Sequence, residues 1–121
     1  SSMAPTIVYA PDGKPMLAIG AAGGSTIIAQ VAKAVIGAVD WGLSAQAAIA
    51  LPQLMGSGDT VRLEAATAAE GLIEPLKAKG HANVTAGGFP LKANAVERVQ
   101  DGWRGGADPR SEGAVRGVTR E

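Results

Sequence analysis

At 121 residues, the chain has the length of one small domain or of part of a larger one. Hydrophobic residues make up 46% of it, which excludes a disordered chain, and 11 basic residues balanced by 11 acidic ones argue against a nucleic-acid partner. With no cysteine and one histidine, the chain offers no thiol nucleophile, disulfide or histidine-rich metal site, and we expect neither a metal nor a cofactor.

Small residues dominate the chain, which has 17 glycines, many alanines and only 3% aromatic residues. A core of alanine, valine, isoleucine and leucine packs closely but buries little area per side chain. We therefore expect the chain to depend on a partner for its stability. No apolar stretch reaches the roughly 18 residues of a membrane-spanning helix, so no membrane span is expected within it.

The first half of the chain is predicted to hold a hairpin followed by two helices. Thr6–Tyr9 and Met16–Gly20 have strand composition, and Asp12-Gly13 between them favours the positive φ of a hairpin turn. Apolar residues at helical spacing predict a helix over Ser25–Val39, buried on most sides. A shorter helix is expected over Ala45–Leu51, with the preceding serine as its N-cap.

The next part is predicted to hold a loop, a strand and a helix. Gln53–Thr60 has the composition of a loop, and Val61–Glu64 alternates like a short strand. Ala68–Lys79 has a helical pattern, with the glycine after it as a left-handed cap. Because Pro75 would remove a hydrogen bond inside a helix, we expect the regular helix to start near Leu72.

The last part is predicted to be mainly strands. His81–Thr85 is one, and Asn94–Gln100 with Trp103–Gly106 forms a second hairpin. A turn at Asp108–Arg110, whose aspartate accepts main-chain hydrogen bonds and pairs with the arginine, precedes a last strand at Ala114–Val118. Both tryptophans are expected to anchor packing. The two hairpins favour an α+β fold with antiparallel layers over a parallel sheet.

The turn between the second strand and the long helix is the most informative feature of the sequence. It reads Ala21-Ala22-Gly23-Gly24-Ser25, and it matches neither the dinucleotide-binding fingerprint nor the P-loop. Glycines here leave main-chain amides free at the positive end of a helix, where a carboxylate, a phosphate or an acyl-transfer oxyanion can bind. One interpretation is a tight packing turn, and the other is an oxyanion hole formed by Gly23 and Gly24.

A pair of serines precedes the first strand. The hydroxyl groups of Ser1 and Ser2 can donate hydrogen bonds to the carboxylate of a substrate. They can equally be ordinary capping residues. Ser1 as an N-terminal nucleophile is a weaker hypothesis, because its place in the sequence does not show maturation by self-cleavage.

Taken together, these motifs resemble the γ-glutamyltranspeptidase family along nearly the whole chain. The Ser-Ser-Met-Ala-Pro-Thr-Ile-Val start and the Gly-Ala-Asp-Pro-Arg end are the most specific parts of the likeness. The segments that carry it are Ser1–Val8, Asp12–Pro15, Gly23–Ser25 with Ile27 and Ile28, Val39–Leu43, Ala50–Leu54, Leu76–His81 and Gly106–Arg110.

The resemblance implies that residues 1–121 are the C-terminal portion of the small subunit of an N-terminal-nucleophile hydrolase, whose fold is an αββα four-layer sandwich. Such a precursor cleaves itself and exposes a catalytic threonine, which would lie upstream of Ser1. By this likeness, Ser1 and Ser2 bind the α-carboxylate of the γ-glutamyl group, and Gly23 and Gly24 form the oxyanion hole. The implied reaction is γ-glutamyl hydrolysis or transfer on glutathione-type substrates.

The resemblance also implies partners and a location. The partners are the rest of the small subunit and the large subunit of the same precursor, without which this chain would be inactive, and the location is periplasmic or secreted. Ala21-Ala22 replaces the Ser/Thr-Pro usual in the family, and Leu54–Ser57 replaces its usual aromatic and histidine residues. The alternatives are a non-catalytic anion-binding or structural module, and a related acylase of the same fold.

Overall fold

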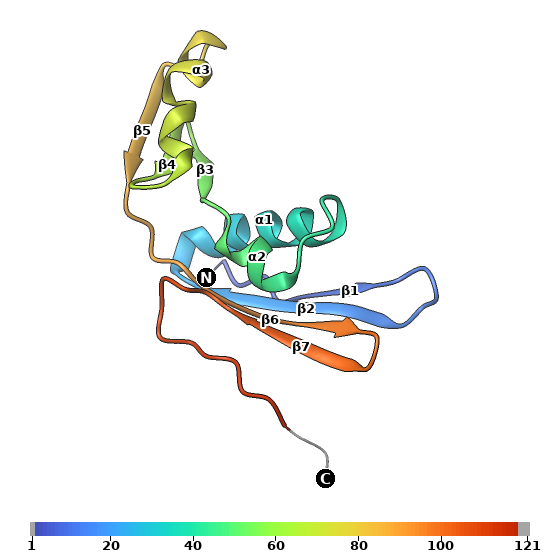
Figure 1. Ribbon diagram of the computed structural model, residues 1–121. Helices are drawn as coiled ribbons and strands as arrows, with labels where there is room; N and C mark the ends of the chain where they lie inside the picture. The colour runs from blue at the N-terminus through green and yellow to red at the C-terminus, as the bar shows by residue number, and fades with distance from the viewer. Residues whose placement is uncertain (1, 119–121) are drawn as a thin grey trace. The chain divides into compact units, whose positions relative to one another are not determined.

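The computed structural model describes residues 2–118, which form two compact units. One unit contains the chain up to residue 51 and again from residue 91 onward, and the other contains residues 52–90. Each unit has its own sheet and its own buried cluster. Both units combine helices with strands, so the predicted α+β class is confirmed (Figure 1).

The predicted N-terminal hairpin is confirmed. β1 (Thr6–Tyr9) and β2 (Pro15–Ala22) pair in antiparallel orientation. In the turn, Gly13 has a φ of 83°, and the Asp12 carboxylate accepts a hydrogen bond of 2.8 Å from the main-chain amide of Lys14. The glycine thus supplies the left-handed conformation and the aspartate closes the turn.

The second predicted hairpin completes a four-stranded antiparallel sheet. It consists of β6 (Lys92–Val99) and β7 (Gly102–Ala107), and the strand order is β1-β2-β6-β7. The two central strands, β2 and β6, run side by side as far as Ala22, which lies opposite Lys92. The end of β2 is therefore held by a segment distant in sequence.

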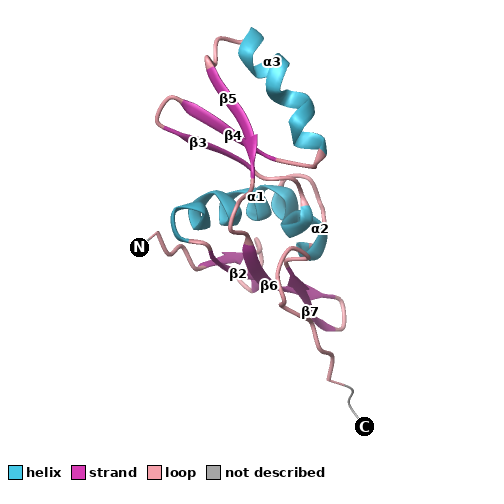
Figure 2. Cartoon of the chain, turned by 90° about the vertical axis from the view of Figure 1, so that its left-hand side faces the viewer, coloured by secondary structure: helices cyan, strands magenta, loops and turns pink. Residues whose placement is uncertain are grey.

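Two helices cover one face of this sheet. After the short 3₁₀ helix η1 (Gly24–Thr26), α1 (Ile27–Val39) and α2 (Ala45–Ala50) lie on the same side of the strands (Figure 2). The hydroxyl oxygen of Ser44 accepts a hydrogen bond of 3.1 Å from the amide of Ala47, which confirms the predicted N-cap. None of the helices in the described part of the chain is long and apolar enough to span a membrane.

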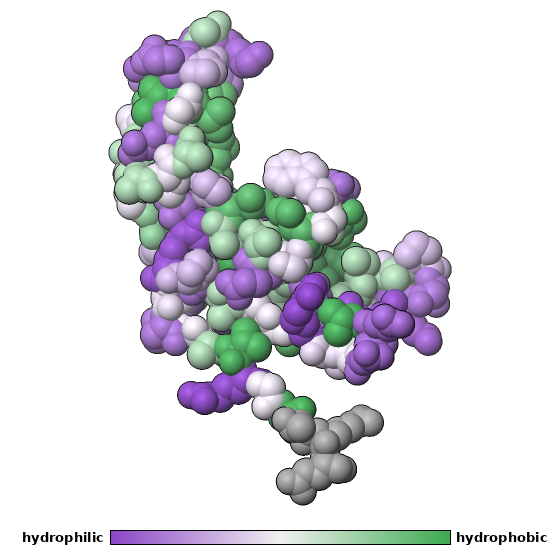
Figure 3. Space-filling model, viewed as in Figure 1, coloured by the Kyte–Doolittle hydropathy of each residue, from purple (hydrophilic) through white to green (hydrophobic). Residues whose placement is uncertain are grey.

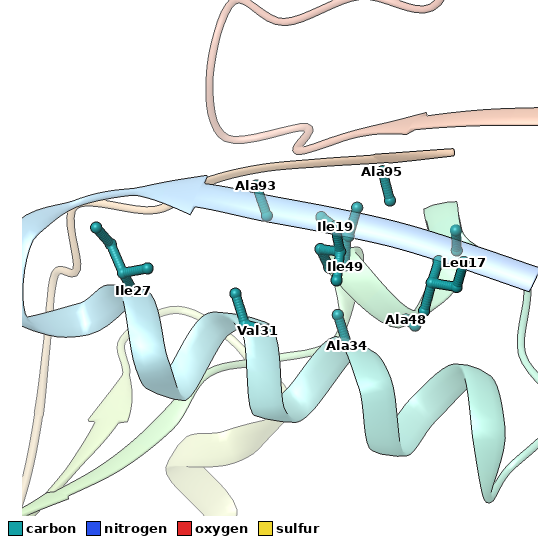
Figure 4. Close-up of a cluster of buried hydrophobic side chains, with 10 residues drawn as sticks. Leu17, Ile19, Ile27, Val31, Ala34, Ala48, Ile49, Ala93 and Ala95 are labelled. Carbon is teal, nitrogen blue, oxygen red and sulfur yellow. The ribbon is translucent and has the colours of Figure 1, made fainter. Parts of the chain in front are cut away.

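The main core lies between these helices and the sheet, and it is built from small side chains (Figure 4). The helices approach closely at Gly37, where an added Cβ would lie 2.9 Å from the Cβ of Ala48. Such close contact compensates for the small area that each alanine buries. The buried members are Leu17, Ile19, Ala93 and Ala95 from the strands, and Ile27, Val31, Ala34, Ala45, Ala48 and Ile49 from the helical side.

The prediction that the long helix is buried on most sides is wrong for the described residues. Ile28, Ile36 and Val39 on α1 are 58%, 43% and 46% exposed. Hydrophobic side chains accordingly gather on the surface in the region of α1 and α2 (Figure 3). The reason is that the sheet and α2 cover only the opposite side of α1, so its remaining apolar face stays open.

The face of the sheet that points away from the helices is also open and apolar. One row of paired residues crosses all four strands on this face: Ile7, Ala18, Val96 and Gly105. Ile7 is 57% exposed, and Trp103 on β7 is 58% exposed. Because Trp41 is also exposed, by 64%, the prediction that the tryptophans anchor packing is wrong within this unit.

The second unit differs most from the prediction. β3 (Leu54–Ser57) lies inside Gln53–Thr60, which the sequence predicted as a loop. It pairs with β4 (Thr60–Glu64) through a tight turn in which Gly58 has a φ of 58°. β5 (Asn83–Gly87) pairs with β4 in parallel, which adds one parallel pair to the antiparallel layers that the sequence predicted. A helical crossover between β4 and β5 makes that parallel pairing possible.

In the helical crossover between β4 and β5, the regular helix starts close to Leu72, as expected from the position of Pro75. The 3₁₀ helix η2 (Ala68–Leu72) leads into α3 (Ile73–Ala78), so Pro75 lies in the first turn, where its missing N–H costs nothing. Gly80 has a φ of 102°, and its amide and that of His81 donate to carbonyls near the end of α3. The predicted left-handed cap is confirmed.

The predicted last strand is wrong, because residues 114–118 have no strand pairing. The segment instead passes close to β7. A Cβ added to Gly105 would lie 2.8 Å from the side chain of Val115. Val115 thus lies against the open face of the sheet without belonging to a strand, whereas Val118 is 96% exposed.

Candidate functional site

The glycine turn lies where β2 ends and the helical segment begins. Gly23 has a φ of 136° and Gly24 a φ of 62°, both in the region that favours glycine. η1 begins at Gly24 and continues directly into α1, so the turn lies at the positive end of a helical segment. The predicted strand–turn–helix arrangement is confirmed.

Within the described residues, the carbonyls of the glycine turn form hydrogen bonds, whereas the amides of its two glycines do not. The carbonyl of Gly23 accepts a hydrogen bond of 3.3 Å from the amide of Thr26, and the carbonyl of Gly24 accepts one from the amide of Ile27. The amides of Gly23 and Gly24 have no hydrogen-bond partner among the described residues. Gly24 is exposed, with no heavy atom within 4 Å of a Cβ built upon it. The turn thus has two adjacent amides that no described residue uses as hydrogen-bond donors.

Two buried polar side chains lie under the turn. Thr26 is 5% exposed and Gln30 is 2% exposed. The Thr26 hydroxyl donates to the carbonyl of Gly23 at 3.0 Å. Nε2 of Gln30 donates to the carbonyl of Ala22 and to Oγ1 of Thr26, each at 2.9 Å, and its Oε1 accepts from the amide of Lys92 at 3.0 Å.

These two side chains were not predicted from the sequence. A signal was present, because Gln30 and Lys33 are the only polar residues of α1. Gln30 also follows Thr26 by four positions, so both lie on one face of a helix. A polar pair on the buried side of an apolar helix must find hydrogen-bond partners, and the strand end beside it provides them.

The serine pair is described only in part. Ser1 lies outside the described residues, and Ser2 is half-buried. In the β1–β2 hairpin, Thr6 pairs with Ile19 and Ile7 with Ala18. The pairing ends at Thr6 and Ile19, and residues 2–5 form no strand. Ser2 lies four residues before Thr6, and Gly23 lies four residues after Ile19.

A hollow of about 620 Å³ lies on the open face of the sheet. Its walls come from β1, β2 and β6, and include Thr6, Gly20 and Asn94. Gly23 and Gly24 are not among its lining residues. The hollow is mainly a feature of the uncovered sheet, and the glycine turn lies beyond the end of β2.

The turn at Asp108–Arg110 is confirmed and has a second function in the structure. Asp108 is 2% exposed, and its carboxylate accepts hydrogen bonds from the main chain and the guanidinium of Arg110, at 2.9 and 3.0 Å. The same guanidinium donates to the carbonyls of Ile49, Ala50 and Leu51. The Arg110 side chain therefore caps the C-terminal end of α2, which the sequence did not reveal.

Comparison with known proteins gives consistent results. A family model described as Gamma-glutamyltranspeptidase matches residues 1–118. The glutathione hydrolase proenzyme of Bacillus subtilis strain 168 is 30% identical over 98% of this chain, and the match covers 20% of the length of that relative. The chain therefore spans about a fifth of this relative.

Solved structures of the same kind superpose well. The γ-glutamyltranspeptidase of Pseudomonas nitroreducens, complexed with L-DON, matches 98% of this chain and 63% of its own, with a TM-score of 0.83 and 27% identity. The T380A mutant of Helicobacter pylori γ-glutamyltranspeptidase matches 92% of this chain and 62% of its own, with a TM-score of 0.82 and 26% identity. The layers described above are part of the N-terminal-nucleophile hydrolase fold, and the chain belongs to the γ-glutamyltranspeptidase family.

Proposed function

We propose that this chain is the part of a γ-glutamyl hydrolase or transferase that binds the substrate carboxylate and stabilises the oxyanion. In this proposal, the amides of Gly23 and Gly24 donate to the oxygen that becomes negative in the tetrahedral intermediate. Ser1 and Ser2 bind the α-carboxylate of the γ-glutamyl group. The nucleophile is an N-terminal threonine of the same precursor, upstream of Ser1.

The observation that carries the proposal is the pair of amides at the glycine turn, which have no hydrogen-bond partner within residues 2–118. Gly23 and Gly24 are adjacent, have positive φ and lie at the start of a helical segment. Two amides fixed in this way act on a developing negative charge without reorganisation. Loss of one such donor lowers kcat by about 10²–10³-fold in enzymes where it has been measured.

The start of the first hairpin is compatible with a role for the serines. The pairing of its strands ends at Thr6 and Ile19, and Ser2 and Gly23 each lie four residues beyond that last pair. A γ-glutamyl group has its α-carboxylate at one end and its reacting carbonyl at the other. Hydroxyl donors beside the oxyanion donors therefore suit the two ends of one small substrate.

The reaction is a two-step acyl transfer. The threonine Oγ attacks the γ-carbonyl and loses its proton, and the carbonyl oxygen takes the negative charge beside Gly23 and Gly24. The C–N bond then breaks and the amine leaves with a proton, which gives a γ-glutamyl ester of the enzyme. Water or a second amine attacks this ester, so the product is glutamate or a new γ-glutamyl amide.

The partners and the location follow from the same proposal. The apolar surfaces left open on α1 and on the sheet are suited to contact with the rest of the small subunit and the large subunit of one precursor. The substrates are glutathione-type γ-glutamyl compounds. The location we propose is periplasmic or secreted.

The test compares two glycine-to-alanine variants of the natural protein with a chromogenic γ-glutamyl anilide as substrate. Gly24 has a φ of 62° and Gly13 a φ of 83°, and an added Cβ meets nothing within 4 Å at either position. Both substitutions therefore carry a similar backbone strain of about 1–2 kcal/mol. Only Gly24→Ala places a methyl group beside the proposed oxyanion.

Alanine keeps its amide, but its methyl group would occupy the open space beside the turn and keep the oxyanion away from the two donors. We therefore expect Gly24→Ala to lower kcat by about 10²-fold, the effect of a lost donor. Gly13→Ala, in the β1–β2 turn, should lower stability and leave kcat unchanged. Equal kcat values for the two variants would overturn the oxyanion role. A wild-type protein that is correctly folded and processed but releases no anilide would overturn the proposed activity.

A further inference from the structure

We propose that Thr26 and Gln30 are positioning residues that fix the directions of the Gly23 and Gly24 amides. The inference rests on the proposed function, because it assigns a task to these side chains in the same reaction. Neither side chain would touch the substrate. Both are buried below the turn, at 5% and 2% exposure.

The geometry of the peptide group explains how a buried side chain controls a distant amide. In a trans peptide, the C=O of one residue and the N–H of the next lie in one plane and point in opposite directions. No cis peptide bond occurs among the described residues. A hydrogen bond that holds the carbonyl therefore fixes the direction of the amide on the other side of the same peptide.

The two peptides that contain the proposed donors are both held in this way. The Gly23 amide belongs to the peptide whose carbonyl is that of Ala22, and Gln30 Nε2 donates to this carbonyl at 2.9 Å. The Gly24 amide belongs to the peptide whose carbonyl is that of Gly23, and the Thr26 hydroxyl donates to it at 3.0 Å. Each donor thus has one buried side chain behind it.

The two side chains also hold each other and the sheet. Gln30 Nε2 donates to Oγ1 of Thr26 at 2.9 Å, which orients the hydroxyl toward Gly23. Gln30 Oε1 accepts from the amide of Lys92, the residue paired with Ala22 across β2 and β6. These hydrogen bonds therefore fix the position of the turn relative to the two central strands. Without them, two adjacent glycines would make the turn mobile.

The test uses the natural protein with substitutions at Thr26 and a matched threonine elsewhere. Thr26→Val keeps the shape and removes the hydroxyl, whereas Thr26→Ser restores it. Thr67→Val is the control, because the Thr67 hydroxyl also makes two local hydrogen bonds, to Glu64 and Ala69, but belongs to the second unit. All variants are assayed with the γ-glutamyl anilide, and their melting temperatures are recorded.

We expect Thr26→Val to lower kcat about 10-fold, less than the 10²–10³-fold of a lost donor, because the amide is misdirected but present. KM should stay within about twofold, since the interaction strengthens only in the transition state. Thr26→Ser should recover most of kcat, and Thr67→Val should lose stability alone. Gln30→Leu should lower kcat at least as much as Thr26→Val.

If Thr26→Val and Thr67→Val have equal kcat at similar melting temperatures, the positioning role is wrong while the proposed activity stands.

A second measurement does not depend on turnover. In ¹H–¹⁵N spectra, Thr26→Val should shift the amide signals of Gly23 and Gly24 and broaden them relative to Thr67→Val. Unchanged Gly23 and Gly24 signals would overturn the positioning role even if the wild-type protein released no product. Altered signals in a protein without γ-glutamyl activity would support the positioning role and overturn only the proposed function.

Discussion

The side-chain amide of Gln46 on α2 forms two hydrogen bonds with the main chain of Ala107 at the end of β7. Its Nε2 donates to the Ala107 carbonyl at 2.7 Å, and its Oε1 accepts from the Ala107 amide at 2.9 Å. The side chain thus takes the place that a neighbouring strand would have at this edge of the sheet. A helix is thereby attached to a sheet edge through the same donor and acceptor that a strand would use.

Gln46→Leu should destabilise the protein more than its exposed position suggests. The change leaves the donor and acceptor of Ala107, which is 8% exposed, without this partner. The expected loss in the free energy of unfolding is about 1–3 kcal/mol. Urea unfolding measures it, with Gln100→Leu as an exposed control that should change stability by no more than about 0.5 kcal/mol. Equal effects of the two substitutions would contradict this role of Gln46.

Arg110→Lys should be strongly destabilising although it keeps the charge. The guanidinium donates at once to the buried Asp108 carboxylate and to the carbonyls that end α2. A lysine ammonium cannot reproduce that planar set of donors. With Arg110→Met, which leaves the carboxylate without its partner, we expect a loss of about 3–5 kcal/mol. Thermal unfolding measures the loss of stability in both variants. A lysine variant as stable as the natural protein would show that a positive charge alone is enough at this position.

Gly37→Ala should destabilise the protein despite the better helix propensity of alanine. An added Cβ would lie 2.9 Å from the Cβ of Ala48 and 3.3 Å from its Cα. Alanine gains about 1 kcal/mol of propensity in a helix, whereas overpacking of a core costs about 1–3 kcal/mol. Gly71→Ala is the matched control in η2, because a Cβ there meets nothing within 4 Å. Chemical denaturation should show a loss for Gly37→Ala only.

The ionisation of Asp12 should make the first hairpin sensitive to acid. The hydrogen bond from the Lys14 amide, and then the charge of Arg98, hold the pKa of the Asp12 carboxyl below its ordinary value. A lowered pKa in the folded state means that this contribution is complete above the ordinary value of about 3.9 and is lost as the pH falls through the folded value.

A titration of the Asp12 carboxyl carbon by NMR checks this expectation. Because the hydrogen bond from the Lys14 amide is the largest single cause and does not involve Arg98, Arg98→Met should raise the pKa of Asp12 only part of the way to its ordinary value. A complete return to the ordinary value would show that Arg98 dominates.

Local signals were enough to predict much of the fold. The Asp12-Gly13 turn, the Ser44 cap, the late start of α3 and the Gly80 cap each depend on a few neighbouring residues. β3 was missed because Gly56 and Ser57 have little strand propensity, and only pairing with β4 makes that segment a strand. The parallel partner of β4 was missed for the same reason, since pairing between distant segments leaves no local pattern.

In the candidate site, too, local features could be predicted from the sequence, whereas features that depend on strand pairing could not. The glycine turn was predicted from its spacing, and the structure has it at the expected end of β2. Gln30 was missed because its partners, Ala22 and Lys92, meet only after β2 and β6 have paired. The sequence thus indicated where the glycine turn lies, whereas the side chains that hold its carbonyls could be identified only once the pairing of the sheet was known.

The exposure of both tryptophans gives the chain two built-in optical reporters. Trp41 follows α1, and Trp103 lies on β7 on the face of the sheet turned away from the helices. Trp41 therefore reports on the surface beside the helices, and Trp103 reports on the open face of the sheet. When other polypeptide covers one boundary, the emission of that indole should move to shorter wavelength and become protected from acrylamide quenching. Single-tryptophan variants can thus report separately when each of the two faces becomes covered.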